Sequence, residues 1–125
     1  MRLTLLRCGL AAAATALVGF LLLTGCRAEG PGTRYIGAIR DVSRILLEGD
    51  ADEGERLDEL GRYWRDNGQG VSTAIRELGE LDADRSLELH DRAERLYGRL
   101  DQELRERPEL RSAPLVRTVM RRLAP

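Results

Sequence analysis

From residue 33 onward, apolar side chains recur along the chain at steps of three and four residues. This spacing places them on one face of an α-helix, and no segment shows the every-second-residue alternation of a half-buried strand. The clearest run steps by four, three and four, and consists of Leu89, Ala93, Leu96 and Leu100. The pattern predicts an all-α fold, a small bundle of four or five amphipathic helices whose short connections favour antiparallel neighbours.

Local signals predict where the first two helices begin and end. The first is expected to start near Thr33 and to stop at Gly49. The second is expected to start at Asp52, because Asp52 and Glu55 have the spacing of a capping box. Asn67-Gly68 is expected to end it, since glycine suits the left-handed turn that often follows a helix.

The third helix is expected to start near Ser72. Residues 82–84 leave open whether residues 71–106 form one helix or two. Pro108 should end this region, because the residue before a proline avoids the helical conformation. The outer face of its second half carries acid-to-arginine pairs at the helical i, i+4 spacing, namely Glu88/Arg92, Asp91/Arg95, Asp101/Arg105 and Glu103/Arg107.

The last helix is expected to begin with Ser112 as its N-cap and Pro114 in its first turn. Its apolar stripe consists of Val116, Val119, Met120 and Leu123. Arginines gather toward its end, where positive charge is favourable at the negative pole of the helix dipole.

The first 26 residues have a different character. Arg2 and Arg7 precede an uncharged run over residues 8–25, and this run ends in Leu23-Thr24-Gly25-Cys26. A positive start, an apolar stretch and small residues before a cut form the layout of a secretory signal. The ending resembles the lipobox of bacterial lipoproteins, in which an aliphatic residue and two small residues precede an obligatory cysteine.

The resemblance implies cleavage between Gly25 and Cys26, a diacylglyceryl thioether on Cys26 and, in many members of this class, acylation of the new amino group. The alternative is an uncleaved membrane helix, since the uncharged run of 18 residues is just long enough to span a bilayer. Its many small residues favour the cleaved signal. Either interpretation exports the rest of the chain.

The lipobox also predicts a place in the cell. The chain is expected in the cell envelope, anchored to a membrane on the exported side by the lipid on Cys26. In Gram-negative bacteria, lipoproteins without Asp directly after the cysteine tend to reach the outer membrane, and Arg27 fits that tendency. Residues 26–32 then form a tether of at most about 20 Å, which keeps a helical domain of residues 33–125 close to the bilayer.

Composition narrows the possible functions. Removing the first 25 of the 125 residues leaves 100, enough for one small domain. This part has a formal net charge of −3, from 18 arginines and 21 acids, so it carries no electrostatic signature of nucleic-acid binding. Cys8 lies in the removed segment and Cys26 carries lipid, so no cysteine is left for a disulfide or a metal.

No catalytic motif is present. His90 is the only histidine, so a His-Glu-x-x-His zinc site cannot form, and the chain has no Gly-x-Ser-x-Gly nucleophile elbow. Gly68-Gln69-Gly70 lacks the further glycine and the lysine of a phosphate-binding loop, so it is interpreted as an interhelical turn. We therefore expect neither an enzyme nor a resident metal or cofactor.

Two carrier functions stay open as alternatives. The acidic run over residues 48–59 partly matches a calcium loop, although glutamate stands where that loop needs glycine. Met120 and His90 could in principle hold a haem between helices. A methionine at helical spacing is more often core filler, and a histidine beside an aspartate on an amphipathic helix is more often a surface residue.

The sequence thus favours a non-catalytic helical module of the envelope that binds a protein partner or serves a structural role. An exported carrier of calcium or haem is the alternative, and a small enzyme is less favoured. Trp64 is expected in the core. Tyr63 beside it would then face outward, where tyrosine is suited to contact a partner protein.

Overall fold

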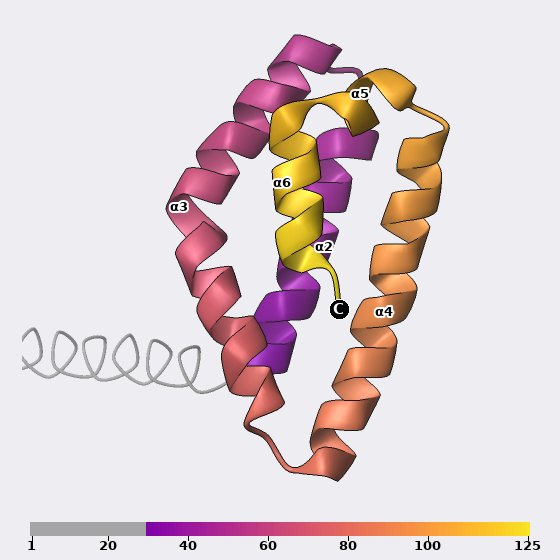
Figure 1. Cartoon of the computed structure of the whole chain (residues 1–125). Coiled ribbons are helices and arrows are strands. Elements are labelled where there is room, and N and C mark those ends of the chain that lie inside the picture. The colour runs from indigo at the N-terminus through magenta and orange to yellow at the C-terminus, as the bar shows by residue number, and fades with distance from the viewer. Residues whose placement is uncertain (1–29) are drawn as a thin grey trace, which may run out of the picture. The chain divides into compact units, whose positions relative to one another are not determined.

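The computed structural model describes residues 30–125, and this part is a bundle of helices without a strand. Its helices are α2 (Pro31–Leu47), α3 (Glu53–Gly79), α4 (Ala83–Arg105), α5 (Pro108–Ser112) and α6 (Pro114–Leu123). Figure 1 shows α2 and α6 lying between the two longer helices α3 and α4, with α5 at one end. The predicted all-α bundle is confirmed. The expected cleavage and lipidation sites at Gly25 and Cys26 lie outside the described residues.

The first two helices begin and end for local chemical reasons. Pro31 opens α2, two residues earlier than expected, because its fixed φ and missing N–H suit a first helical position. After α2, Gly49 adopts a φ of 78°, the left-handed region that favours glycine. Asp52 caps α3 as predicted: its Oδ1 accepts a hydrogen bond from Glu55 N at 2.8 Å, and Glu55 Oε2 accepts one from Asp52 N at 3.4 Å.

The expected helix end at Asn67-Gly68 was wrong. Helix α3 continues without interruption through Gly68 and Gly70 to Gly79, so the second and third expected helices are one. Gly68 is buried against the ring of Trp64, a close fit that a larger side chain would obstruct. Packing of a long helix against its neighbours outweighs the roughly 1 kcal/mol that each internal glycine costs relative to alanine.

The connection after α3 settles the question left open for residues 71–106. The chain leaves the helix at Glu80 and re-enters one at Ala83, so this range spans two helices. Helix α4 ends at Arg105, before Pro108, as expected. Pro108 then opens the short helix α5, which the sequence pattern did not reveal.

The start of the last helix differs by one residue from the prediction. Ala113, not Ser112, occupies the N-cap of α6, and Pro114 follows as the first helical residue. The Ser112 hydroxyl instead donates to the carbonyl oxygen of Glu109 at 3.1 Å. Because Ser112 is the last residue of α5, its side chain is directed back at α5 and cannot cap α6.

The core is a single apolar cluster to which all the helices contribute. Its largest fully buried side chains are Tyr35, Ile39, Leu46, Leu60, Leu78, Leu100, Leu104, Leu123, Val42, Val116 and Val119. Trp64, expected in the core, is only partly buried and packs against the cluster. Because the cluster lies entirely within residues 35–123, residues 31–125 form a compact unit with a core of their own.

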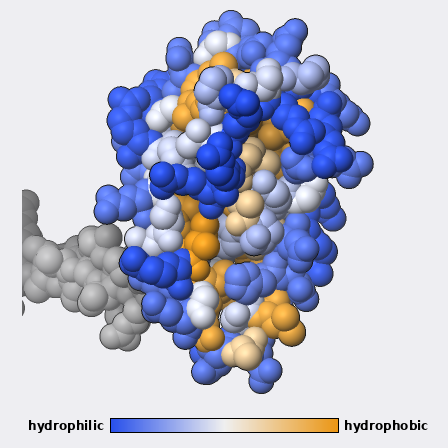
Figure 2. All heavy atoms as spheres, viewed as in Figure 1, coloured by the Kyte–Doolittle hydropathy of each residue, from blue (hydrophilic) through white to orange (hydrophobic). Residues whose placement is uncertain are grey.

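Two tyrosine hydroxyls fasten α6 to its neighbours. Tyr35 of α2 donates to the carbonyl oxygen of Leu123, and Tyr97 of α4 donates to that of Met120 at 3.0 Å. Both acceptors lie near the end of α6. The Leu123 carbonyl belongs to the last turn, where carbonyl groups lack helical partners, whereas the Met120 carbonyl also accepts a hydrogen bond from Ala124 N at 3.0 Å. Figure 2 shows the face that carries α6, with polar side chains over most of it and apolar residues visible in strips between them.

Candidate protein-contact groove

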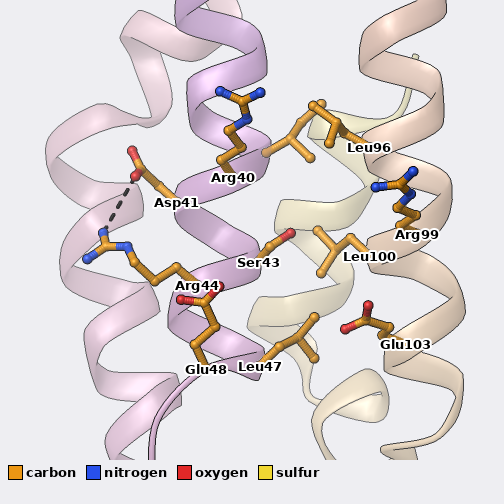
Figure 3. A pocket seen from close by; sticks show the side chains of 11 residues that line it. Arg40, Asp41, Ser43, Arg44, Leu47, Glu48, Leu96, Arg99, Leu100 and Glu103 are labelled. Atoms are coloured by element: carbon orange, nitrogen blue, oxygen red, sulfur yellow. Dashed lines mark hydrogen bonds and ion pairs between the residues drawn. The ribbon is translucent and has the colours of Figure 1, made fainter.

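A groove of about 520 Å³ lies between α2 and α4. The groove is lined by Ile39, Arg40, Asp41, Ser43, Arg44 and Leu47 of α2, by Glu48 directly after the end of α2, and by Leu96, Arg99, Leu100 and Glu103 of α4. Figure 3 shows these side chains, with α6 behind the two helices, so the groove opens on the side that α6 does not cover.

The floor of the groove is apolar. Ile39 and Leu100 are fully buried beneath it, whereas Leu47 and Leu96 remain partly exposed. The run of leucines and alanine predicted on α4 explains this arrangement. Ala93 and Leu100 point into the core, and Leu96 lies at the edge of the same stripe, where no further helix covers it.

The rim of the groove carries charged side chains whose sign changes along the helix direction. Arg40 and Arg99 lie in the half of the groove nearer Leu96, and Glu48 and Glu103 lie in the half nearer Leu47 (Figure 3). All four are exposed, and within residues 30–125 none of them forms an ion pair. The groove therefore has a positive half and a negative half along the helix direction.

Arg44, a further charged residue of the groove, does form an ion pair. Its guanidinium pairs with the Asp41 carboxylate at 3.5 Å and points away from the groove, as Figure 3 shows. Asp41 also accepts a hydrogen bond from the Tyr63 hydroxyl of α3 at 3.3 Å. These contacts leave Asp41 and Arg44 largely neutralised at the edge of the groove.

Tyr63, the predicted partner contact, is partly buried at the contact of α3 with α2. Burial, and then the charge and hydrogen bond of Asp41, raise its pKa to about 12, against a smaller opposing effect of Arg44. The structure thus places its hydroxyl against α2, beside a residue of the groove.

The acidic run over residues 48–59 folds around a residue that sequence reasoning missed. Arg56 is the one buried charged side chain of the described part, with 6% of its surface exposed. Its guanidinium donates to the carbonyl oxygen of Ile45 in the last turn of α2 at 3.2 Å. It also donates to three carbonyl oxygens of the α2–α3 connection, those of Glu48 at 2.7 Å, Gly49 at 2.6 Å and Ala51 at 2.9 Å. One feature of the sequence could have pointed to Arg56: it is the single arginine among seven acids, near the start of a capped helix.

This arrangement argues against the calcium alternative at this loop. A calcium loop supplies backbone and side-chain oxygens to the ion, and here a fixed cationic side chain already occupies the carbonyl oxygens. Within residues 30–125, no three His, Cys, Asp or Glu residues lie close enough together to hold a metal ion.

The two residues considered for haem are not brought together. Met120 is buried and shares a shallow hollow with Asp101 of α4. His90 lies eleven residues before Asp101 on the same helix, roughly 16 Å away along the axis. His90 is only partly buried. The pair therefore does not face a common site.

Among the expected acid-to-arginine pairs on α4, Asp101 and Arg105 form an ion pair at 3.2 Å, and Asp101 also reaches Arg111 at 3.7 Å. Arg107 instead crosses to α2, where it donates to the carbonyl oxygens of Leu46 and Leu47, each at 3.4 Å. The contact fixes the end of α4 beside the end of α2.

No protein-family model, curated protein or solved structure matches this chain. No helix within residues 30–125 is long and apolar enough to cross a membrane.

Proposed function

We propose that this chain is an exported lipoprotein whose helical domain is a non-catalytic protein-binding module, held at an envelope membrane by lipid on Cys26. The observation that carries the proposal is the sequence Leu23-Thr24-Gly25-Cys26 at the end of an uncharged run that follows two arginines. A cysteine at that place supplies the thiol that receives the lipid.

The anchor determines how far from the membrane the domain works. One acyl chain holds a protein only marginally and two hold it stably, at about 0.8 kcal/mol per buried CH₂. The first helix begins at Pro31, so residues 27–30 connect it to the lipidated cysteine. This connection spans at most roughly 18 Å, so the domain would act on partners at the membrane surface.

The α2–α4 groove supports the protein-binding role. It combines partly exposed leucines over a buried floor with a charged rim, and an apolar centre with a polar rim is the usual anatomy of a protein interface. The expected partner is a protein at the same membrane surface, this chain included, that places apolar side chains over Leu47 and Leu96.

The anchor is tested by intact-mass analysis of the full chain purified from bacterial membranes in mild detergent. We expect a polypeptide that starts at Cys26 and carries added acyl mass. Cys26→Ser should abolish both the cleavage and the added mass, whereas Cys8→Ser should change neither in the mature protein, because Cys8 lies in the removed segment. A wild-type protein that retains Met1 to Gly25 would refute the lipoprotein proposal.

The groove is tested by cross-linking in the membrane followed by mass spectrometry. Leu96→Glu should remove the cross-linked partner, because it places a charge on the apolar floor. Leu87→Glu is the matched control on the same helix, since Leu87 is 64% exposed and lies outside the groove. Equal loss of the partner with both variants would count against the groove as the contact surface.

A further inference from the structure

We propose that the occupant of the α2–α4 groove is a second copy of this chain, related by a two-fold axis that sets α2 against α2 and α4 against α4 in antiparallel directions. This inference rests on the proposed function only in taking the groove as a protein-contact surface. The rim charges, the register of the two helices and the residue at the centre of the groove all support it.

The rim charges are arranged for self-pairing. Glu48 directly follows the last residue of α2, and its N–H still donates to the Arg44 carbonyl oxygen at 3.1 Å, as in a helix. Arg40 and Glu48 are therefore eight residues apart, about 12 Å along the axis of α2. On α4, Arg99 and Glu103 are four residues apart, about 6 Å. An antiparallel copy brings each arginine opposite the glutamate of the same helix in the other chain. Because the two-fold axis relates the two chains, each arginine–glutamate contact between them is made twice.

A single two-fold axis must satisfy both helices, and the register of α2 and α4 allows it. The axis that exchanges Arg40 with Glu48 crosses α2 at Arg44, and the one that exchanges Arg99 with Glu103 crosses α4 at Asp101. The two helices touch where Gly32 of α2 packs directly against the Leu89 side chain of α4 and leaves no room for a Cβ.

Twelve residues further along each helix from that contact are Arg44 and Asp101. The two helices run in the same direction, because Arg107 at the end of α4 reaches Leu46 and Leu47 at the end of α2. Arg44 and Asp101 therefore lie at nearly the same level, and one axis serves both charge pairs.

The centre of the groove suits a close approach of two copies. Ser43, a small residue, lines the groove at the level of the axis. Arg44 would meet its own symmetry mate, but it is paired with Asp41 and directed aside (Figure 3). Leu47 and Leu96, partly exposed in one chain, would be covered by the second.

The same charges disfavour the parallel arrangement. A two-fold axis along the helices would set α2 of one copy against α4 of the other at the same level. Arg40 would then lie within about 3 Å, along the helix direction, of the level of Arg99, and Glu48 within about 3 Å of the level of Glu103. Like charges placed opposite each other oppose association, so the rim selects the antiparallel dimer.

The test uses residues 27–125, which contain the whole core and no cysteine. Sedimentation equilibrium should show a monomer–dimer equilibrium. Arg99→Glu should weaken the dimer on the order of tenfold or more, because it sets two glutamates opposite each other on each side of the axis. Arg99→Glu combined with Glu103→Arg should restore the wild-type dimer, because the exchanged charges pair again.

Restoration by the double variant is a result that a loss of folding could not produce. Arg62→Glu, an exposed change on α3, is the control and should leave the dissociation constant unchanged. As a second measurement, Ser43→Cys should form a covalent dimer on mild oxidation, whereas Ser112→Cys, an exposed site outside the groove, should not.

A wild-type domain that stays monomeric across the concentration range would overturn the inference, as would a double variant no better than Arg99→Glu alone. Either result leaves lipidation of Cys26 standing, and a chain that proves to be unlipidated leaves the dimer standing. The two proposals therefore fail independently.

Discussion

At the scale of single residues, Arg56 holds the connection between the first two described helices. Its planar guanidinium bonds carbonyl oxygens from both the end of α2 and the loop that follows. Seven acids surround it in sequence, yet its direct partners are backbone oxygens, because the turn directs them inward. Sequence pattern alone could not show this, since the partners belong to a helix end whose position depends on the packing of α2 on α3.

We predict that Arg56→Met destabilises the domain by about 3 kcal/mol. Methionine replaces the aliphatic stem of the arginine but not its guanidinium, so the carbonyl oxygens of Glu48 and Gly49 lose their donor. Hydrogen bonds to charged groups contribute about 1.5–3 kcal/mol each. Urea denaturation followed by circular dichroism measures the loss. Arg62→Met, on the exposed face of α3, should change stability by less than about 0.5 kcal/mol. Similar losses for both variants would contradict the role given to Arg56.

The buried Tyr35 and the partly buried Tyr63 predict how the domain responds to alkaline pH. Burial raises the pKa of Tyr35 to about 12, with a smaller contribution from Tyr97, and the pKa of Tyr63 is also about 12. An unfolded tyrosine titrates near 10. Because the folded state favours the neutral form, this contribution to stability is fully present below pH 10 and is lost as the pH rises from 10 to 12.

The free energy of unfolding should therefore fall steeply over that interval, and tyrosinate absorbance should rise later than in the urea-unfolded chain. Tyr35→Phe should flatten the fall in stability. At neutral pH the same variant should cost about 1 kcal/mol, because it removes the hydrogen bond to the Leu123 carbonyl oxygen. Tyrosines that titrate near pH 10 in the folded domain would show that burial does not hold them neutral.

At the scale of elements, α3 shows how packing decides between two local signals. Asn67-Gly68 and Gly70 both favour a helix end, and helix α3 passes through them. The Asn67 side chain donates to the Tyr63 carbonyl oxygen within the helix at 2.9 Å instead of ending it. The two glycines differ in their surroundings: Gly68 lies against Trp64, and Gly70 has open space where a Cβ would be.

We predict that two glycine-to-alanine changes in this helix differ in their effect on stability. Gly70→Ala should stabilise the domain by about 0.5–1 kcal/mol, because alanine has the higher helix propensity and nothing stands in its way. In Gly68→Ala the new methyl group would lie 3.0–3.2 Å from Trp64 ring atoms, so the gain should be cancelled or reversed. Thermal unfolding of both variants compares them directly. Equal stabilisation by both would mean that Trp64 moves aside without cost.

At the scale of the whole molecule, the short helix α6 completes the core. Its buried side chains are Val116, Val119, Met120 and Leu123, and it lies between α3 and α4 (Figure 1). Burying each such side chain contributes about 1.5–3 kcal/mol. Together they approach the total stability of a small domain, about 5–15 kcal/mol.

A chain that ends at Ser112 should therefore lose cooperative unfolding and most of its ordered tertiary structure. Near-ultraviolet circular dichroism and a thermal melt measure this. Removing only Ala124 and Pro125, which are exposed, should leave the melting temperature nearly unchanged. A truncated chain that still melts cooperatively near the wild-type temperature would show that the other helices form a sufficient core without α6.

The amino-acid sequence by itself determined the helical class, the capping of α3 at Asp52, the end of α4 before Pro108 and the apolar stripe of α6. These features depend on local spacing and on the chemistry of one or two residues. Tertiary structure alone decided three features: α3 continues through Gly68, Arg56 donates hydrogen bonds to the end of α2, and α2 and α4 leave a groove with opposite charges in its two halves. Each of these features depends on distances between residues far apart in the chain. Helical periodicity does not indicate which helices are neighbours, or how two neighbouring helices are positioned along their axes.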